Sequence, residues 1–157
     1  MTVSIQVQLV GAVIQGDQIL VEELIQNGAN VHEPALGHQT FLELAIQCNR
    51  FKVAEVLVHH VDIYACDYLR YAVSHGRADI LDLLLRHVTC MDLTALLYSA
   101  AMQGKLNVVK VLLNHGARLG PETSSILETI KKRGHDDVWH EQDGTSSNSI
   151  NQPSHVL

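Results

Sequence analysis

Residues 94–119, TALLYSAAMQGKLNVVKVLLNHGARL, are the stretch that decides the fold. Two apolar segments, 96–101 and 108–113, lie on either side of a turn at Gly104. In the second segment the apolar residues recur at helical spacing and form one stripe. Gly116 then stands where a helix commonly ends in a left-handed residue. The stretch therefore predicts two helices joined by a tight turn, and so small a hairpin needs similar neighbours to bury its stripe.

Copies of this hairpin run through the rest of the chain. Aligned on the turn between the two helices, the equivalent residues are Gly16, Asn49, Gly76, Gly104 and Gly134. Four positions before each turn stand Ala12, Ala45, Ala72, Ala100 and Ile130. Pairs of aliphatic residues recur at matching places after the turn. The chain therefore contains an internal repeat with a period of about 30 residues.

The repeats resemble those of the ankyrin-repeat family, which are about 33 residues long and carry a T-P-L-H-x-A signature. The resemblance is carried by the runs 27–31 (NGANV), 40–45 (TFLELA), 104–117 and 131–136 (KKRGHD), and it covers roughly residues 5–140. It implies an all-α solenoid of four full helix-turn-helix repeats and a truncated fifth. The chain departs from the signature at its proline and histidine positions, which hold Phe41, Tyr68 and Leu96, and Glu43, Arg70 and Tyr98.

The repeats differ in the loops that connect one helix pair to the next. Residues 33–39 (EPALGHQ) form the one loop of full family length. Repeats two and three lack about five residues at this place, so the resemblance implies β-hairpin loops shortened to tight turns. The helical pattern fades near residue 140. We therefore expect a repeat domain at 1–140 and a polar tail at 141–157 with the composition of a disordered segment.

The apolar spacing predicts ten helical segments, the last one short, and almost no β-structure. Besides the two quoted above, the segments with clear limits are about 5–15, 18–26, 41–47, 51–59, 68–74, 78–86 and 124–132. Ser4 is expected to cap the first helix with its side chain, and Asp67 and Asp79 are expected just ahead of their helices. Trp139, the only tryptophan, is expected to cover the last full repeat.

The ends of the second helices carry two further signals. Gly28 and Gly116 hold the left-handed position in two repeats, but Val61 and Val88 replace them in the middle repeats. Because β-branched residues resist that conformation, these ends are expected to turn differently. Three histidines share one equivalent position: His60, His87 and His115. We expect their imidazoles to cap helix carbonyls, since stacking would place them roughly 10 Å apart, too far to share a metal ion.

Composition limits the class of protein. Hydrophobic residues make up 46% of the chain but aromatic residues only 4%, which indicates thin aliphatic layers rather than one deep core. No run approaches the roughly 20 apolar residues of a membrane span. The start of the chain has no positive residue and is a poor secretory signal. Three cysteines without paired spacing suggest a reducing, cytoplasmic compartment. We expect a monomer.

Charge is distributed unevenly along the chain, whose net charge is −6. Residues 1–49 hold five acidic residues and no Lys or Arg, and residues 136–157 hold four acidic residues and no basic one. Residues 50–135 are mildly basic. This pattern argues against nucleic-acid binding, which requires a basic stripe. The charges either solvate ordinary faces or select a partner by charge.

The sequence offers no catalytic, cofactor or metal site. Cys48, Cys66 and Cys90 lie in different repeats and form no paired-cysteine motif. A cysteine nucleophile would need a nearby base, and His75 could approach Cys48 or Cys66 across the stack. No glycine-rich phosphate loop is present. We therefore predict that the protein is not an enzyme, with a His/Cys metal-binding protein or an enzyme as remote alternatives.

Protein binding is the predicted function, and the resemblance implies where it takes place. Ankyrin-like stacks recognise proteins with a concave face built from loop tips and the exposed side of the first helices. Carried over by register, the partner-binding positions are Gln39, Gln47, Cys48, Tyr64, Cys66, Ser74, His75, Asp92, Thr94, Met102, Gln103, Lys132 and Arg133. Tyr64, His75 and Met102 are the expected anchors, because large or adaptable side chains carry most interface energy.

Two more specific roles follow from likeness alone. The size resembles that of small ankyrin-type kinase inhibitors, so a stoichiometric inhibitor is one alternative. The tail has an acidic lead-in, a Ser/Thr/Asn-rich middle and an apolar end at Val156 and Leu157. It resembles the C-terminal export signals of bacterial effectors that are injected into host cells. The second hypothesis is therefore an effector that binds a host protein after delivery.

Overall fold

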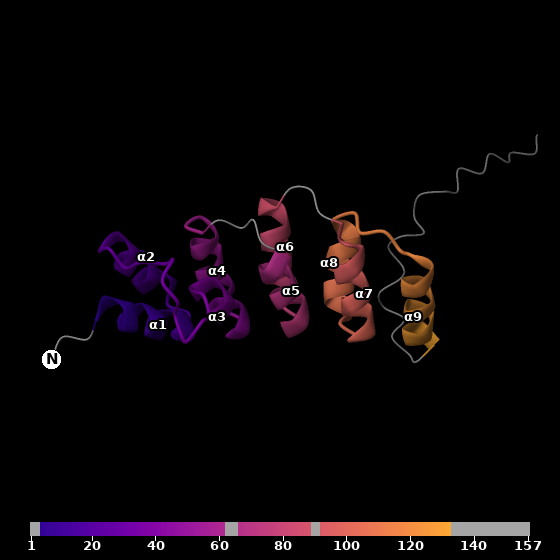
Figure 1. Ribbon diagram of the computed structural model, residues 1–157, viewed down its shortest axis with the longest axis horizontal. Helices are drawn as coiled ribbons and strands as arrows, with labels where there is room; N and C mark the ends of the chain where they lie inside the picture. The colour runs from indigo at the N-terminus through magenta and orange to yellow at the C-terminus, as the bar shows by residue number, and fades with distance from the viewer. Residues whose placement is uncertain (1–3, 62–65, 89–91, 133–157) are drawn as a thin grey trace, which may run out of the picture.

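The computed structural model describes residues 4–61, 66–88 and 92–132, which form an all-α stack of helix pairs (Figure 1). Within these ranges nine helices follow one another: α1 (Ile5–Gln15), α2 (Gln18–Gln26), α3 (Phe41–Gln47), α4 (Phe51–Val58), α5 (Cys66–His75), α6 (Ala78–His87), α7 (Thr94–Met102), α8 (Leu106–Asn114) and α9 (Pro121–Lys132). The predicted tenth segment, the lid at Trp139 and the tail at 141–157 lie outside the described residues.

The helices form two layers that run along the stack (Figure 1). The first-helix layer contains α1, α3, α5, α7 and α9, each in contact with the next. The second-helix layer contains α2, α4, α6 and α8 in the same order, and each second helix also packs on the first helix of its own repeat. This arrangement confirms the predicted all-α solenoid.

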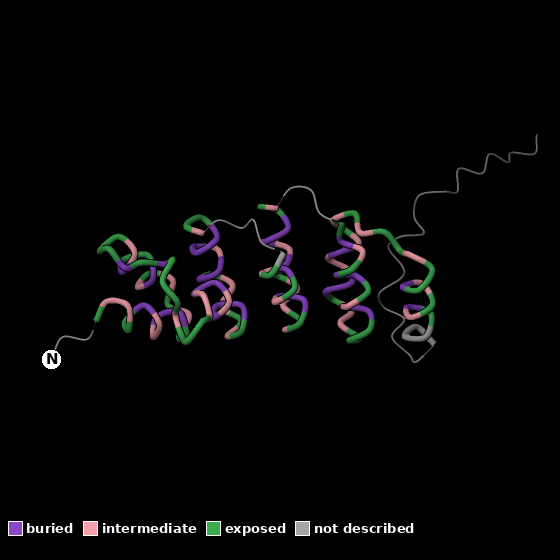
Figure 2. Tube along the Cα trace, in the orientation of Figure 1, coloured by how far each residue is buried: buried purple, intermediate pink, exposed green. Residues whose placement is uncertain are grey.

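The core is a continuous thin layer rather than a single centre (Figure 2). The alanine four positions before each turn is almost or completely buried: Ala12, Ala45, Ala72 and Ala100. Small side chains there let neighbouring helices approach closely, while leucine, isoleucine and valine fill the space beside them. Every repeat therefore buries its apolar stripe against the repeats on either side.

The four described turns within repeats each contain a residue in the left-handed region, at the positions where the alignment predicts a tight turn. Gly16, Gly76 and Gly104 have φ values of 80°, 66° and 66°, and Asn49 has φ 56°. Asparagine is among the non-glycine residues that tolerate this region. Val88, in contrast, is extended with φ −106° and ψ 119°, which confirms that a β-branched residue ends its helix differently from Gly28 or Gly116.

The loops between repeats differ in length, with residues 27–40 joining α2 to α3 but only 115–120 joining α8 to α9. In the longer loop, Leu36 and Gln39 form an isolated antiparallel bridge, and Asn30 exchanges two hydrogen bonds with the Gln6 side chain. The middle parts of the two shortened loops, 62–65 and 89–91, lie outside the described residues. The tight-turn conformation predicted there stays a prediction.

A basic side chain ties each inner repeat to the one before it. The residue after the turn is Arg50, Arg77 or Lys105. Its side chain donates to carbonyls at the end of the first helix of the preceding repeat. Arg77 reaches the carbonyls of Ile46 and Gln47 at 3.2 and 3.0 Å. A cation at this place satisfies orphan carbonyls and complements the negative end of the helix dipole.

The first repeat differs at this position because no described repeat precedes it. Asp17 stands there and caps α2 by accepting a hydrogen bond from the Leu20 N–H. The Arg50 side chain also lies so close to Gly16 that an added Cβ would meet its Cδ at 2.8 Å. The switch from an acidic residue in the first repeat to basic residues in the next three therefore follows from stacking.

Several predicted helix starts are wrong in detail. Ser4 precedes α1, but its side chain makes no capping hydrogen bond. Asp67 and Asp79 lie inside the first turns of α5 and α6 rather than ahead of them, which still favours a carboxylate. α9 begins at Pro121, because proline has no N–H to lose in a first turn and its φ suits a helix.

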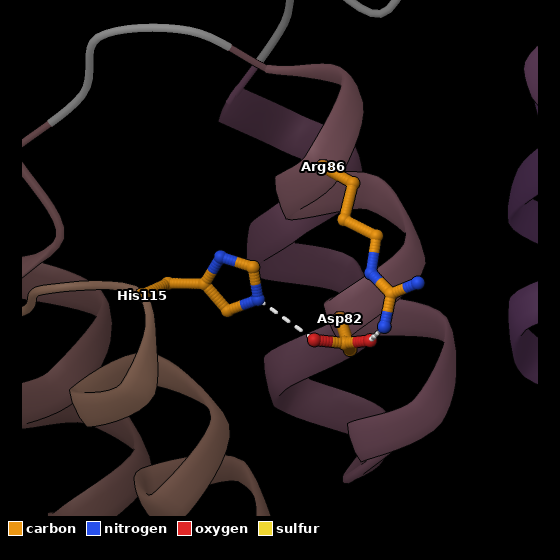
Figure 3. A network of polar contacts seen from close by, with 3 residues as sticks. All are labelled: Asp82, Arg86 and His115. Atoms are coloured by element: carbon orange, nitrogen blue, oxygen red, sulfur yellow. Dashed lines mark hydrogen bonds and ion pairs between the residues drawn. The ribbon is translucent and has the colours of Figure 1, made fainter.

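The predicted histidine caps are wrong where the structure shows these side chains in contacts. The imidazole Nε2 of His115 lies 2.7 Å from a carboxylate oxygen of Asp82 on α6, one repeat back, instead of bonding a carbonyl of its own helix (Figure 3). The ring of His87 packs edge-on against His59, with ring centres 5.4 Å apart. These side chains join repeats to one another, because a charged or aromatic partner on the neighbouring helix lies within reach.

Candidate functional site

The first-helix face is the exposed side of the first-helix layer together with the loop residues that precede α3, α5 and α7. It corresponds to the surface that the resemblance identifies as concave. Two neighbouring junctions along this face, α3–α5 and α5–α7, differ in which side chains cover them.

The α3–α5 junction is closed by a polar network. The side-chain amide of Gln39 donates to Gln47 Oε1 at 2.9 Å and to the Tyr71 hydroxyl at 3.0 Å. Gln39 precedes α3, Gln47 ends α3, and Tyr71 lies on α5. The network therefore spans two repeats, and it includes two of the predicted partner-binding residues.

Tyr71 is also held from its own helix. Its ring lies 4.3 Å, centre to centre, from the imidazole of His75 one turn further along α5. His75 Nδ1 is 2.9 Å from the Tyr71 carbonyl oxygen and 3.2 Å from Ser74 Oγ. The Ser74 hydroxyl donates to the same carbonyl at 2.9 Å. His75 is therefore engaged at the end of α5 and is a packed part of the network.

The α5–α7 junction is open. A hollow of about 390 Å³ lies between the two helices. Its floor is apolar, formed by the buried side chains of Val73 and Leu96. Its polar lining comes from Arg70, Ser74, Asp92 and Ser99. The volume falls in the range of about 300–1,000 Å³ that is typical of small-ligand sites, although this hollow is open to solvent.

The charges around the hollow are unevenly engaged. Hydrogen bonds from the Thr94 side chain and then its backbone N–H, at 2.9 Å, lower the pKa of Asp92. Asp92 is therefore ionised at neutral pH. Arg70 makes no ion pair or hydrogen bond within the described ranges. Burial lowers the pKa of Lys105, whose ammonium group is directed at the carbonyls of Val73 and Ser74.

The remaining predicted partner-binding residues spread along the same face. Met102 is 60% exposed at the end of α7. Gln103 donates to Ser99 Oγ at 2.9 Å and accepts from Lys105 at 2.6 Å, while Cys48 is half-buried at the end of α3. Tyr64 and Arg133 lie outside the described residues, and the side chains of Cys66 and Lys132 are not described either.

The sequence did not single out Tyr71 at the edge of the α3–α5 junction, or Ser99 and Arg70 at the α5–α7 junction. Tyr71 and Ser99 lie five positions before their turns, where the second repeat has Leu44 and the first has Gly11. The signal in the sequence was the change in side-chain size at this position from one repeat to the next. An aligned comparison of the repeats at that position would have found it.

The part of the chain that the structure describes holds no group of three or more His, Cys, Asp or Glu side chains placed to bind a metal ion. Within that part, no helix combines the length and the apolar character needed to cross a membrane.

One comparison with known proteins matches part of the repeat region. Residues 65–123 match the family model described as ankyrin repeats (3 copies). The match covers α5 to α8 and the start of α9, so it includes the hollow. No curated protein matches the chain.

Proposed function

We propose, from the premise that this chain carries ankyrin repeats, that it binds a partner protein through the first-helix face and performs no catalysis. Ankyrin repeats are protein-interaction modules, so binding a protein is the general role. The face, the residues and the type of contact are what the proposal adds.

One observation supports the choice of face more than any other. The Gln39–Gln47–Tyr71 network, the hollow between α5 and α7, and the exposed Met102 follow one another along the first-helix layer. Together they offer a fixed polar contact, a concavity and an adaptable apolar side chain. Stable interfaces combine such elements around a small number of anchoring residues.

The second-helix layer offers less. Two of its ion pairs, Lys52–Glu55 on α4 and Asp82–Arg86 on α6, each join residues of one helix whose side chains are largely solvent-exposed. Such pairs contribute little free energy and change little on binding. This layer also has a hollow, of about 330 Å³, lined by Phe51, Asp79, Asp82 and Val111. The choice of the first-helix face therefore rests on the polar network and the exposed Met102 that accompany its hollow.

A photo-crosslinking experiment with the full chain tests the proposal. A photoreactive residue replaces Gln47 or Met102 on the first-helix face, or Lys52 or Lys110 on the second-helix layer as matched controls. We expect the same partner to be captured from the first two positions and not from the controls. Capture from the control positions alone would contradict the assignment of the face.

A further inference from the structure

The register position five residues before each turn faces the preceding repeat. Tyr71 at this position reaches back to Gln39 in repeat two, and Ser99 lines the hollow against α5. Leu44 at this position is a buried residue of α3, the helix that contacts α1. This position therefore holds a leucine in repeat two, a tyrosine in repeat three and a small serine in repeat four.

From this comparison we propose that the hollow between α5 and α7 receives a tyrosine side chain of the partner protein, in the place that Tyr71 takes between α3 and α5. The inference rests on the proposed function, since it names the chemistry that the first-helix face recognises. Within this protein, Tyr71 already occupies the equivalent position at the adjacent junction.

The lining of the hollow suits an aromatic ring with a hydroxyl at its end. Val73 and Leu96 supply an apolar floor for the ring, whose burial is the main source of affinity. The Asp92 carboxylate accepts from Thr94 and has further acceptor capacity, and the Ser99 hydroxyl is both donor and acceptor. A phenol can donate to the former or accept from the latter.

Arg70 adds to the selectivity for an aromatic side chain. Arg70 lines the hollow, and its guanidinium has no polar partner among the described residues. A guanidinium within about 6 Å of a ring face is attracted to it, and an aliphatic side chain would gain nothing from this contact. An aliphatic side chain of the partner would also leave the polar lining without a new hydrogen bond.

The first test uses a defined probe on the full chain. N-acetyl-tyrosinamide is titrated into the isotopically labelled protein, with N-acetyl-phenylalaninamide and N-acetyl-leucinamide as comparison probes. We expect saturable shifts of the backbone amide signals of Val73, Leu96 and Ser99, largest for tyrosine, smaller for phenylalanine and absent for leucine. Equal shifts for leucine, or none for tyrosine, would overturn the inference.

Matched variants locate the probe. Ser99→Tyr fills the hollow from within and should abolish the shifts, whereas Asn114→Tyr, an exposed position on α8, should leave them unchanged. Tyr71→Ser should open an equivalent hollow and add shifts at Ile46 and Gln47. If Ser99→Tyr does not fold, Ala95→Tyr on the rim of the same hollow replaces it. Probe binding that survives a folded filling variant contradicts the inference.

The partner found by crosslinking separates this inference from the proposed function. Ser99→Tyr should weaken its binding by about tenfold or more, the loss expected for a filled anchor pocket, and Asn114→Tyr should not. A partner that still binds Ser99→Tyr with full affinity overturns the tyrosine pocket and leaves the first-helix face intact. Crosslinks confined to the second-helix layer would instead overturn the proposed function, while the probe titration still decides the hollow.

Discussion

The junctions α3–α5 and α5–α7 share one buried apolar layer, the shared floor of the stack, and differ at both of their solvent-facing edges. Ala72 and Ala100 are fully buried in the floor, flanked by leucines of the neighbouring helices. On the first-helix face, Tyr71 closes the first junction through Gln39, whereas Ser99 leaves the second open. The buried layer holds neighbouring repeats together. The side chain at the edge determines whether the surface of a junction is filled or hollow.

The opposite edge differs in the kind of contact. In the second-helix layer, the α4–α6 junction is bridged by the rings of His59 and His87. The next junction is bridged by Asp82 and His115, and Asp82 also pairs with Arg86 of its own helix (Figure 3). The closed junction thus relies on ring packing, and the open one on charge. We expect the two junctions to respond differently to mutation and to pH.

Overpacking the shared floor should have the largest effect and should not distinguish the junctions. Ala72→Leu and Ala100→Leu each insert three heavy atoms into fully buried positions, so each should lower the free energy of unfolding by roughly 1–3 kcal/mol. Ala95→Leu, at an exposed position on α7, is the control and should be nearly neutral. Urea unfolding followed by circular dichroism measures all three; two neutral core variants would mean that the helix register is wrong.

Removing the basic ties should come next in size and should affect both junctions. Arg77→Met and Lys105→Met remove the donors to the ends of α3 and α5, and each should lower the free energy of unfolding by about 1–2 kcal/mol. The control is Lys110→Met, since Lys110 makes no polar contact in the part of the chain that is described. A loss for the control equal to that for Arg77→Met would show that general charge, rather than the carbonyl contacts, is responsible.

The sequence predicts the shared floor well and the edges poorly. Apolar spacing and turn glycines locate the helices to within a few residues, because a buried stripe and a left-handed turn each restrict residue type strongly. Gln39, Gln47, Ser74 and Asp92 contribute to the network and the hollow of the first-helix face, and their role in binding a partner stays a prediction. Their contacts were not predicted, since a hydrogen bond between repeats depends on side-chain direction rather than on spacing.

The histidine at the end of each second helix shows why edge contacts are hard to predict. His87 and His115 share one register position but contact different partners, a neighbouring imidazole and a neighbouring carboxylate. The partner depends on which residue stands on the adjacent helix, and that residue varies between repeats. Periodicity identifies the position, and only the three-dimensional neighbour identifies the interaction.

Removing the Tyr71 hydroxyl should separate the closed junction from the open one. Tyr71→Phe keeps the ring and loses the bond to Gln39, so it should lower the free energy of unfolding by about 0.5–1 kcal/mol. Ser99→Ala at the equivalent position of the open junction should cost less, because the side-chain bond that Ser99 makes among the described residues is to Gln103 at the end of its own helix. Thermal unfolding of both variants measures the difference. Equal losses would show that Gln39 does not tie the two repeats together.

The smallest expected effect concerns the charged edge of the open junction and depends on pH. The hydrogen bond from His115 lowers the pKa of Asp82, with Arg86 contributing, while partial burial opposes the shift. A carboxyl whose pKa is lower in the folded state stabilises the fold above its unfolded value, about 3.9, and loses that stabilisation as pH falls through the folded value.

At pH 7, Asp82→Asn should therefore lower the free energy of unfolding by about 0.5 kcal/mol, a small value because the pair is partly exposed and screened. The deficit should shrink as pH falls below about 4, because the carboxyl group is protonated first in the unfolded state and then, at its lower pKa, in the folded state. Urea unfolding between pH 7 and pH 3 measures this, and a cycle with His115→Ala isolates the coupling between the two repeats. A deficit that stays constant down to pH 3, or a cycle without coupling at pH 7, would show that charge does not hold this edge together.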